Sequence, residues 1–116
     1  MHMVRCRYQP IGGYKPFIDE TMKLAYGDNA DVLKNKQVAA VQALSGTGAC
    51  RLMAEFQRRY LPQSKVLIPK PTWANHHNIW RDAGVDKQEF RYYNPSTQGL
   101  DFDGMMEDLK ARYHLD

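Results

Sequence analysis

The fold is decided by residues 38–60, which read VAAVQALSGTGACRLMAEFQRRY. Residues 38–44 form a nearly continuous apolar run, and the glycine-rich residues 45–48 follow it. An apolar run that ends at such a turn is typical of a strand buried on both faces. From Ala49 to Pro62 the apolar period becomes helical, and Pro62 stops the helix. The predicted inward residues of this helix are Leu52, Met53, Phe56 and Tyr60.

The segments on either side repeat the alternation of strands and helices. Strands that alternate with helices pair in parallel through right-handed crossovers. The predicted fold class is therefore α/β, with a three-layer, mostly parallel sheet and crossover helices. Three strands leave the sheet edges open, which a complete domain normally covers or extends. The predicted elements are strands at residues 65–68 and 88–93, helices at 16–26, 74–83 and 102–113 (N-cap Asp101 or Asp103), a polar connection at 28–36, a turn at 94–99 and an irregular segment at 1–7.

Composition excludes several classes of protein. The 116 residues suffice for one domain, and 43% are hydrophobic, which is an ordinary globular content. No apolar run approaches the roughly 20 residues that span a bilayer, so we expect no membrane partner. The net charge of +3 is spread without a basic stripe, so we expect no nucleic-acid partner. Cys6 and Cys50 form no disulfide framework, and Cys50 is predicted to be a reduced, buried core thiol.

The glycine-rich turn is the strongest chemical signal. Ser45, Gly46 and Thr47 lie between a predicted strand and a predicted helix, where free backbone amides favour an anion such as phosphate. A tight turn with no ligand has the same pattern, so both interpretations stay open. The lysine of a P-loop is missing after Gly48, and Arg51 stands where the dinucleotide fingerprint needs a small residue. Both observations disfavour a nucleotide-binding α/β domain.

A second signal lies after the second predicted strand. Ligands of open α/β sheets bind outside the carboxyl ends of the strands, so Trp73 is expected beside the glycine-rich turn. There it could stack on a planar ring, with His76 as a polar contact; a Trp at the edge of the core is the alternative. His76 and His77 are adjacent and point apart on a helix, so no metal site is expected. Trp80 is predicted to pack in the core, as are Met53, Phe56 and Tyr60.

Several strings of residues together carry a family resemblance. They read YQPIGG at 8–13, LAYGD at 24–28, VQALSGTGA at 41–49, PKPTWANH at 69–76, IWRDAG at 79–84, RYYNP at 91–95 and GLDF at 99–102. In this order they resemble the aspartate aminotransferases, homodimeric enzymes of the fold-type I pyridoxal-phosphate group. The resemblance covers nearly the whole chain from Tyr8 onward. It implies that residues 1–116 are part of the large, cofactor-binding domain, and we expect an internal fragment of such an enzyme.

The resemblance also implies roles for individual residues. Gly46 and Thr47 match the positions that hold the phosphate of pyridoxal 5′-phosphate, and Ser45 opens that turn. Tyr8 matches a Tyr that reaches the phosphate in the neighbouring subunit. Trp73 matches a Trp that stacks on the pyridine ring and contacts the substrate carboxylate. His76 matches a His that supports the partner of the pyridine nitrogen.

The catalytic residues of the family have no match in this chain. Ser45 has no identifiable His–Asp partners, and Lys65 and Lys70 lie outside the family's lysine motif. The Schiff-base Lys is expected downstream of Asp116, so the chain alone should be inactive. The implied reaction of the full-length parent moves an amino group between L-aspartate and 2-oxoglutarate, giving oxaloacetate and L-glutamate. The alternative is a non-catalytic, short α/β module for phosphate binding or oligomerisation. The compartment, mitochondrial or cytoplasmic, is left open.

Overall fold

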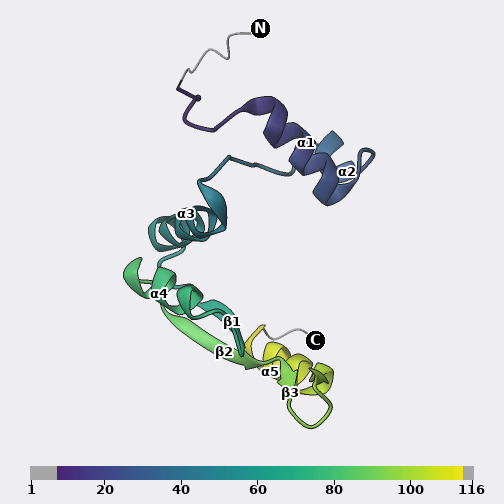
Figure 1. Cartoon of the computed structure of the whole chain (residues 1–116), viewed down its shortest axis with the longest axis vertical. Helices are drawn as coiled ribbons and strands as arrows, with labels where there is room; N and C mark the ends of the chain where they lie inside the picture. The colour runs from purple at the N-terminus through teal and green to yellow at the C-terminus, as the bar shows by residue number, and fades with distance from the viewer. Residues whose placement is uncertain (1–7, 114–116) are drawn as a thin grey trace, which may run out of the picture. The chain divides into compact units, whose positions relative to one another are not determined.

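The computed structural model describes residues 8–113, so the expectation for residues 1–7 lies outside the described part. The chain divides into two compact units, Met1–Gly46 and Thr47–Asp116, each of which is described by itself. The elements in chain order are α1 (Lys15–Tyr26), α2 (Asp31–Lys34), α3 (Ser45–Tyr60), β1 (Val66–Lys70), α4 (Ala74–Asp82), β2 (Lys87–Arg91), β3 (Tyr93–Asn94), β4 (Gly99–Leu100) and α5 (Phe102–Tyr113) (Figure 1).

Helix α1 begins and ends where its sequence predicts. Pro16 lies in the first turn, where its missing N–H costs no hydrogen bond. Gly27 follows the last turn with a φ of 90°, and its N–H donates to the Lys23 carbonyl oxygen at 2.7 Å. The polar stretch after α1 contains the one-turn helix α2, which the sequence analysis did not predict.

The predicted strand at residues 38–44 is wrong. These residues adopt no strand, and the side chains of Val41 and Leu44 are exposed. A strand buried on both faces needs hydrogen-bonded neighbours, and no described residue pairs with this segment in a ladder. The segment is held instead by backbone groups of residues that precede α1. Gln42 N donates to Gly12 O at 2.9 Å, and Gln42 Oε1 accepts from Tyr14 N at 2.8 Å.

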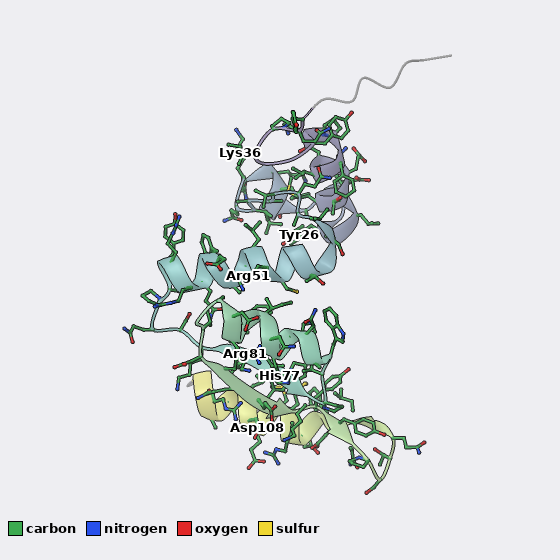
Figure 2. All side chains as sticks on the ribbon, turned by 60° about the vertical axis from the view of Figure 1, so that its left-hand side comes forward. Tyr26, Lys36, Arg51, His77, Arg81 and Asp108 are labelled. Carbon is green, nitrogen blue, oxygen red and sulfur yellow. The ribbon has the colours of Figure 1, made fainter. Side chains whose placement is uncertain are left out.

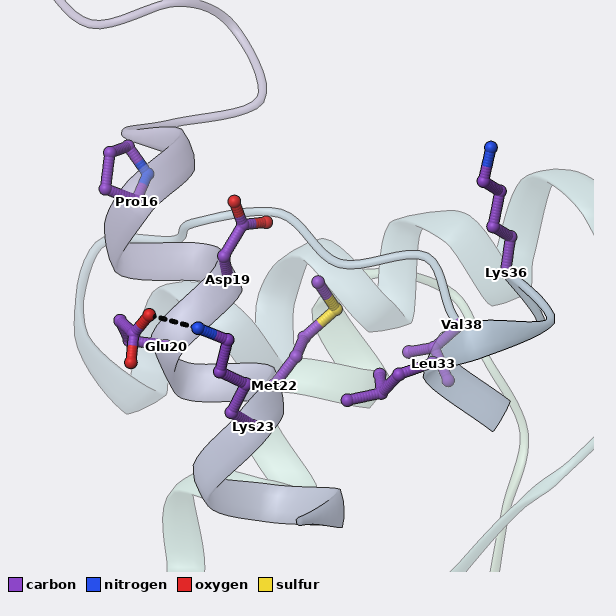
Figure 3. Close-up of a pocket in the computed structure, with 8 residues that line it drawn as sticks. All are labelled: Pro16, Asp19, Glu20, Met22, Lys23, Leu33, Lys36 and Val38. Carbon is purple, nitrogen blue, oxygen red and sulfur yellow. Dashed lines mark hydrogen bonds and ion pairs between the residues drawn. The ribbon is translucent and has the colours of Figure 1, made fainter. Parts of the chain in front are cut away.

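Among residues 8–46, the described part of the first unit, no residue is fully buried. A hollow of about 390 Å³ opens beside α1, with Met22 and Leu33 in its lining and an ion pair between Glu20 and Lys23 at its edge (Figure 3). Residues 38–42 line a second hollow along α1, of about 230 Å³. The described apolar side chains of this unit therefore line hollows, and residues 8–46 form no closed core.

The second unit contains the parallel strand pair that the sequence predicts. Strand β1 pairs with β2 in a register that runs from Val66 opposite Lys87 to Lys70 opposite Arg91. Helix α4 connects the two strands, as a crossover requires. The predicted turn after β2 closes a small antiparallel hairpin, β3–β4, which continues into α5. Of the three predicted strands, two are confirmed.

Figures 1 and 2 show α4 and α5 on opposite sides of this strand pair. On one side Glu89 of β2 lies near His77 of α4. On the other, the Arg91 guanidinium binds Asp108 of α5 at 2.8 Å and Glu107 at 2.6 Å. The Arg91 hydrogen bonds, including one from its backbone N–H, lower the pKa of Asp108 to about 2.

The core of the second unit lies between α3, α4 and β1. It consists of Ala54, Ile79, Ala83 and Val85, with Val66, Trp80 and Cys50 packed against it. The predicted full burial of Cys50 is wrong, because Cys50 is half-buried, and its reduced state stays a prediction. The predicted packing of Trp80 is confirmed. Among the described residues, no helix is both long and apolar enough to cross a bilayer.

The predicted inward face of α3 is wrong. The predicted residues Leu52, Met53, Phe56 and Tyr60 are 48–62% exposed, whereas Ala54 is 0% and Gln57 8% exposed. Ala54 packs in the core with Ile79, Ala83 and Val85, and Gln57 is buried because both ends of its amide are hydrogen-bonded. Its Nε2 donates to Ser64 Oγ at 2.9 Å, and its Oε1 accepts from Trp80 Nε1 at 3.0 Å.

Candidate functional site

The glycine-rich turn is the first turn of α3. The helix begins at Ser45, four positions earlier than the predicted Ala49. Ser45 has a φ of 63°, in the left-handed region, so the chain bends sharply as it enters the helix. Ser45, Gly46 and Thr47 are all exposed. The predicted turn therefore presents the end of a 16-residue helix to solvent.

This helix end fits a phosphate group. The first N–H groups of an α-helix have no partner within the helix, and the helix dipole adds positive potential there. The first turn carries no acidic residue that would repel an anion. A Cβ built on Gly46 would meet no atom within 4 Å, so the space beside this backbone is open. The Thr47 hydroxyl can supply a further donor at the same end.

The Trp73 loop, which we define as residues 71–73, follows the carboxyl end of β1 and leads into α4. The Trp73 side chain is 54% exposed, so it is not part of the core; Trp80 takes that role. The rings of Trp73 and His76 meet edge to face, with centroids 5.4 Å apart and an interplanar angle of 87°. Thr72 Oγ1 and His76 Nδ1 are hydrogen-bonded at 2.7 Å. The indole of Trp73 is thus about half exposed, and part of its surface is available to a planar ligand.

The sequence did not predict the contacts of Glu89, which lies next to this loop. Glu89 Oε2 lies 3.1 Å from Lys70 Nζ, and Glu89 Oε1 lies 3.8 Å from His77 Nε2. The sequence shows only that Glu89 lies on a predicted strand. The register of β2 against β1 decides which residues Glu89 can contact. Within the described residues, no group of His, Cys, Asp and Glu side chains could hold a metal ion.

The structure brings the predicted site residues together in two groups. Ser45, Gly46 and Thr47 share one helical turn, and Trp73 and His76 are in contact. Tyr8 is fully exposed in the first unit. The use of these residues in one binding site stays a prediction.

Comparison with known proteins assigns the chain to a family. A family model described as "Aminotransferase class I and II" matches residues 2–114. The chain belongs to this family. The chain is 57% identical over 103 residues to "Aspartate aminotransferase, mitochondrial" of Arabidopsis thaliana, covering 89% of this chain and 24% of the relative. It is 50% identical over 105 residues to "Aspartate aminotransferase, cytoplasmic" of Dictyostelium discoideum, covering 90% of this chain and 24% of the relative.

The chain thus spans about a quarter of the length of the curated relatives it matches. Solved structures agree with the sequence relatives. The cytoplasmic aspartate aminotransferase of Saccharomyces cerevisiae superposes with a TM-score of 0.89 at 31% identity, over 95% of this chain and 27% of that one. An aromatic-amino-acid aminotransferase from Burkholderia pseudomallei, covalently bound to pyridoxal phosphate, gives 0.87 at 35% identity, over 93% and 27%. The predicted fold class, an incomplete portion of a fold-type I aminotransferase, is confirmed.

Proposed function

We propose that this chain forms part of the cofactor site of an aspartate aminotransferase. The proposed reaction of a polypeptide of the relatives' length is amino-group transfer between L-aspartate and 2-oxoglutarate, which gives oxaloacetate and L-glutamate. The observation that carries the proposal is the open, glycine-containing first turn of α3, found in a chain 57% identical to a plant enzyme of that name. The proposed partners are these amino acids and oxo acids and a second subunit. The proposed compartment is mitochondrial or cytoplasmic.

The proposed cofactor is pyridoxal 5′-phosphate, and two groups of residues would hold it. The backbone N–H groups at Gly46 and Thr47 would bind its phosphate, with the Thr47 hydroxyl as a further donor and Ser45 at the entrance of the turn. Trp73 would stack on its ring and contact the substrate carboxylate, and His76 would orient the polar groups beside the ring. When bound, the cofactor supplies an electron sink that stabilises negative charge at the α-carbon of the amino acid.

Tyr8 is the proposed contribution of one subunit to the other. Its side chain is fully exposed, so its hydroxyl is free to reach a group outside its own unit. We propose that it binds the phosphate of the neighbouring subunit's cofactor, which makes the site a shared one in a homodimer. A Tyr8→Phe change should then weaken phosphate binding only where two subunits associate, which a concentration series can measure.

The chain by itself is proposed to be inactive. Lys70 is paired with Glu89, and neither Lys70 nor Lys65 lies in the family's lysine motif. Without that Lys, the described residues can bind and orient a ligand but cannot move the α-proton. A coupled assay for oxaloacetate formed from aspartate and 2-oxoglutarate should therefore give only the rate of free pyridoxal 5′-phosphate. Turnover above that rate, with borohydride trapping of the cofactor on a single Lys, would contradict this proposal.

The binding role is tested by calorimetric titration of the 116-residue chain with inorganic phosphate and with pyridoxamine 5′-phosphate. The second ligand carries ring and phosphate but lacks the aldehyde that surface lysines would capture. We expect both to bind and the ring to add affinity. Thr47→Val should weaken both ligands about 10- to 100-fold, because a hydrogen bond to a charged group contributes about 1.5–3 kcal/mol. Equal affinity for both ligands would favour the phosphate-binding module, and no binding of either would refute the proposal.

A further inference from the structure

The Trp73 loop is tied at both of its ends to strand β2. Lys70 is the last residue of β1 before the loop, and His77 lies in the first turn of α4 after it. The two carboxylate oxygens of Glu89 divide between them, with 3.1 Å to Lys70 Nζ and 3.8 Å to His77 Nε2. A single side chain of β2 therefore spans the loop on which Trp73 stands.

A second side chain of β2 reaches the same turn of α4. Lys87 Nζ donates to the backbone oxygen of His77 at 3.1 Å. Lys87 and Glu89 are two positions apart on β2, and both contact His77 of α4. These two side chains of β2 thus hold the start of α4 through one hydrogen bond to its backbone and one side-chain contact.

Within the loop, few contacts determine how the indole of Trp73 is oriented. The ring is about half exposed and meets the His76 ring edge to face. His76 is in turn hydrogen-bonded to Thr72 at 2.7 Å. Thr72 and Trp73 lie in the loop and His76 lies in α4, so these contacts join the indole to the start of that helix. The contacts from β2 in turn hold the start of the helix.

We propose that Glu89 is a positioning residue, which sets the orientation of the Trp73 loop through Lys70 and His77 and so prepares Trp73 to stack on a cofactor ring. The inference deepens the proposed function and rests on it for the identity of that ring. Exposed ion pairs contribute little to global stability, since each gains little in water and immobilises long side chains. The Lys70 and Glu89 side chains are 73% and 44% exposed, so the expected effect is on the loop and not on unfolding.

The test compares Glu89→Gln with Glu107→Gln in the full chain. Both substitutions remove one negative charge from an exposed ion pair, but Glu107 lies in α5 and pairs with Arg91 and not with Lys70 or His77. The chain contains two tryptophans, so labelling with 5-fluorotryptophan gives two ¹⁹F resonances, which Trp73→Phe and Trp80→Phe assign. In Glu89→Gln we expect the Trp73 resonance to shift and the Trp80 resonance to stay. Glu107→Gln should leave both unchanged.

The salt dependence of the Trp73 resonance is a second measurement, and it would not change if Glu89 had a purely structural role. At about 1 M salt the screening length falls to about 3 Å, so the exposed contacts of Glu89 weaken. The Trp73 resonance of the wild-type chain should then move toward its position in Glu89→Gln, and that of the variant should not respond. Affinity for pyridoxamine 5′-phosphate should fall about two- to fivefold in Glu89→Gln, with affinity for inorganic phosphate unchanged.

The two proposals fail in different ways. A Trp73 resonance that is identical in the wild type, Glu89→Gln and Glu107→Gln overturns the positioning role of Glu89, whatever the ligand titrations give. A chain that binds neither ligand, but whose Trp73 resonance responds to Glu89→Gln, refutes the proposed function and supports the control of the loop by Glu89. Loss of the ring's added affinity in both Gln variants equally also overturns the inference.

Discussion

Gly46→Ala separates the stability of α3 from its proposed binding of phosphate. A Cβ at Gly46 meets no atom within 4 Å, and Gly46 is not among the glycines with a positive φ. Alanine therefore fits this position without strain in the unliganded chain. Every Cα–Cβ bond of a helix tilts toward the N-terminus, so the new methyl group projects toward the space over the helix end. That is the space in which the phosphate would lie.

Gly46→Ala should affect stability and phosphate affinity in opposite directions. Alanine is favoured over glycine by up to about 1 kcal/mol within a helix, so the variant should be as stable as the wild type or slightly more stable. A phosphate displaced by the methyl group would lose a charge-assisted hydrogen bond to a backbone N–H, which contributes about 1.5–3 kcal/mol. The dissociation constants of inorganic phosphate and pyridoxamine 5′-phosphate should rise about 10- to 100-fold.

Urea unfolding followed by circular dichroism measures the first effect, and calorimetric titration measures the second. Gly12→Ala is the matched control, because a Cβ at Gly12 also meets open space but lies in the turn before α1. The control should bind both ligands like the wild type. Unchanged affinity in Gly46→Ala would refute the placement of phosphate at this helix end. Weakened binding accompanied by lost helix content would refute the argument that alanine fits without strain.

Three further predictions concern the second unit. Ile79→Ala should lower the free energy of unfolding by about 2–4 kcal/mol, because Ile79 is 6% exposed in the core. Ile11→Ala removes the same atoms from a fully exposed side chain and should cost little. Equal urea midpoints for the two variants would contradict this prediction. Asp101→Ala should cost about 1 kcal/mol, since Asp101 Oδ1 accepts the N–H of the first turn of α5 at 3.1 Å, and unchanged exchange of the α5 amides would argue against this cap. Pairing with Arg91 lowers the pKa of Asp108 from 3.8 to about 2, so the stabilisation from this pair should be complete above about pH 4 and be lost as the pH falls through 2. In acid titrations followed by circular dichroism, Asp108→Asn should lack this loss of stability. Identical titration curves for the wild type and the variant would refute the prediction.

The site was predictable where it depends on local chemistry. A helix that starts at a glycine-rich turn and a Trp that follows a strand are both visible in the order of residues, and the structure places them so. The contacts of Glu89 with Lys70 and His77 were not predictable. They depend on the register in which Ile68 lies opposite Glu89, and no pattern within either strand determines that register.

The difference between local signals and contacts between distant segments also explains where the predicted fold was wrong. Helix hydrogen bonds join residues four positions apart, so Pro16, Gly27 and Asp101 mark helix ends within the sequence itself. A strand exists only if another segment pairs with it, and residues 38–44 have no such partner among the described residues. Burial likewise depends on what a helix meets. The amphipathic pattern identified α3 as a helix, but only its packing against α4 decided that the stripe with Ala54 and Gln57 turns inward.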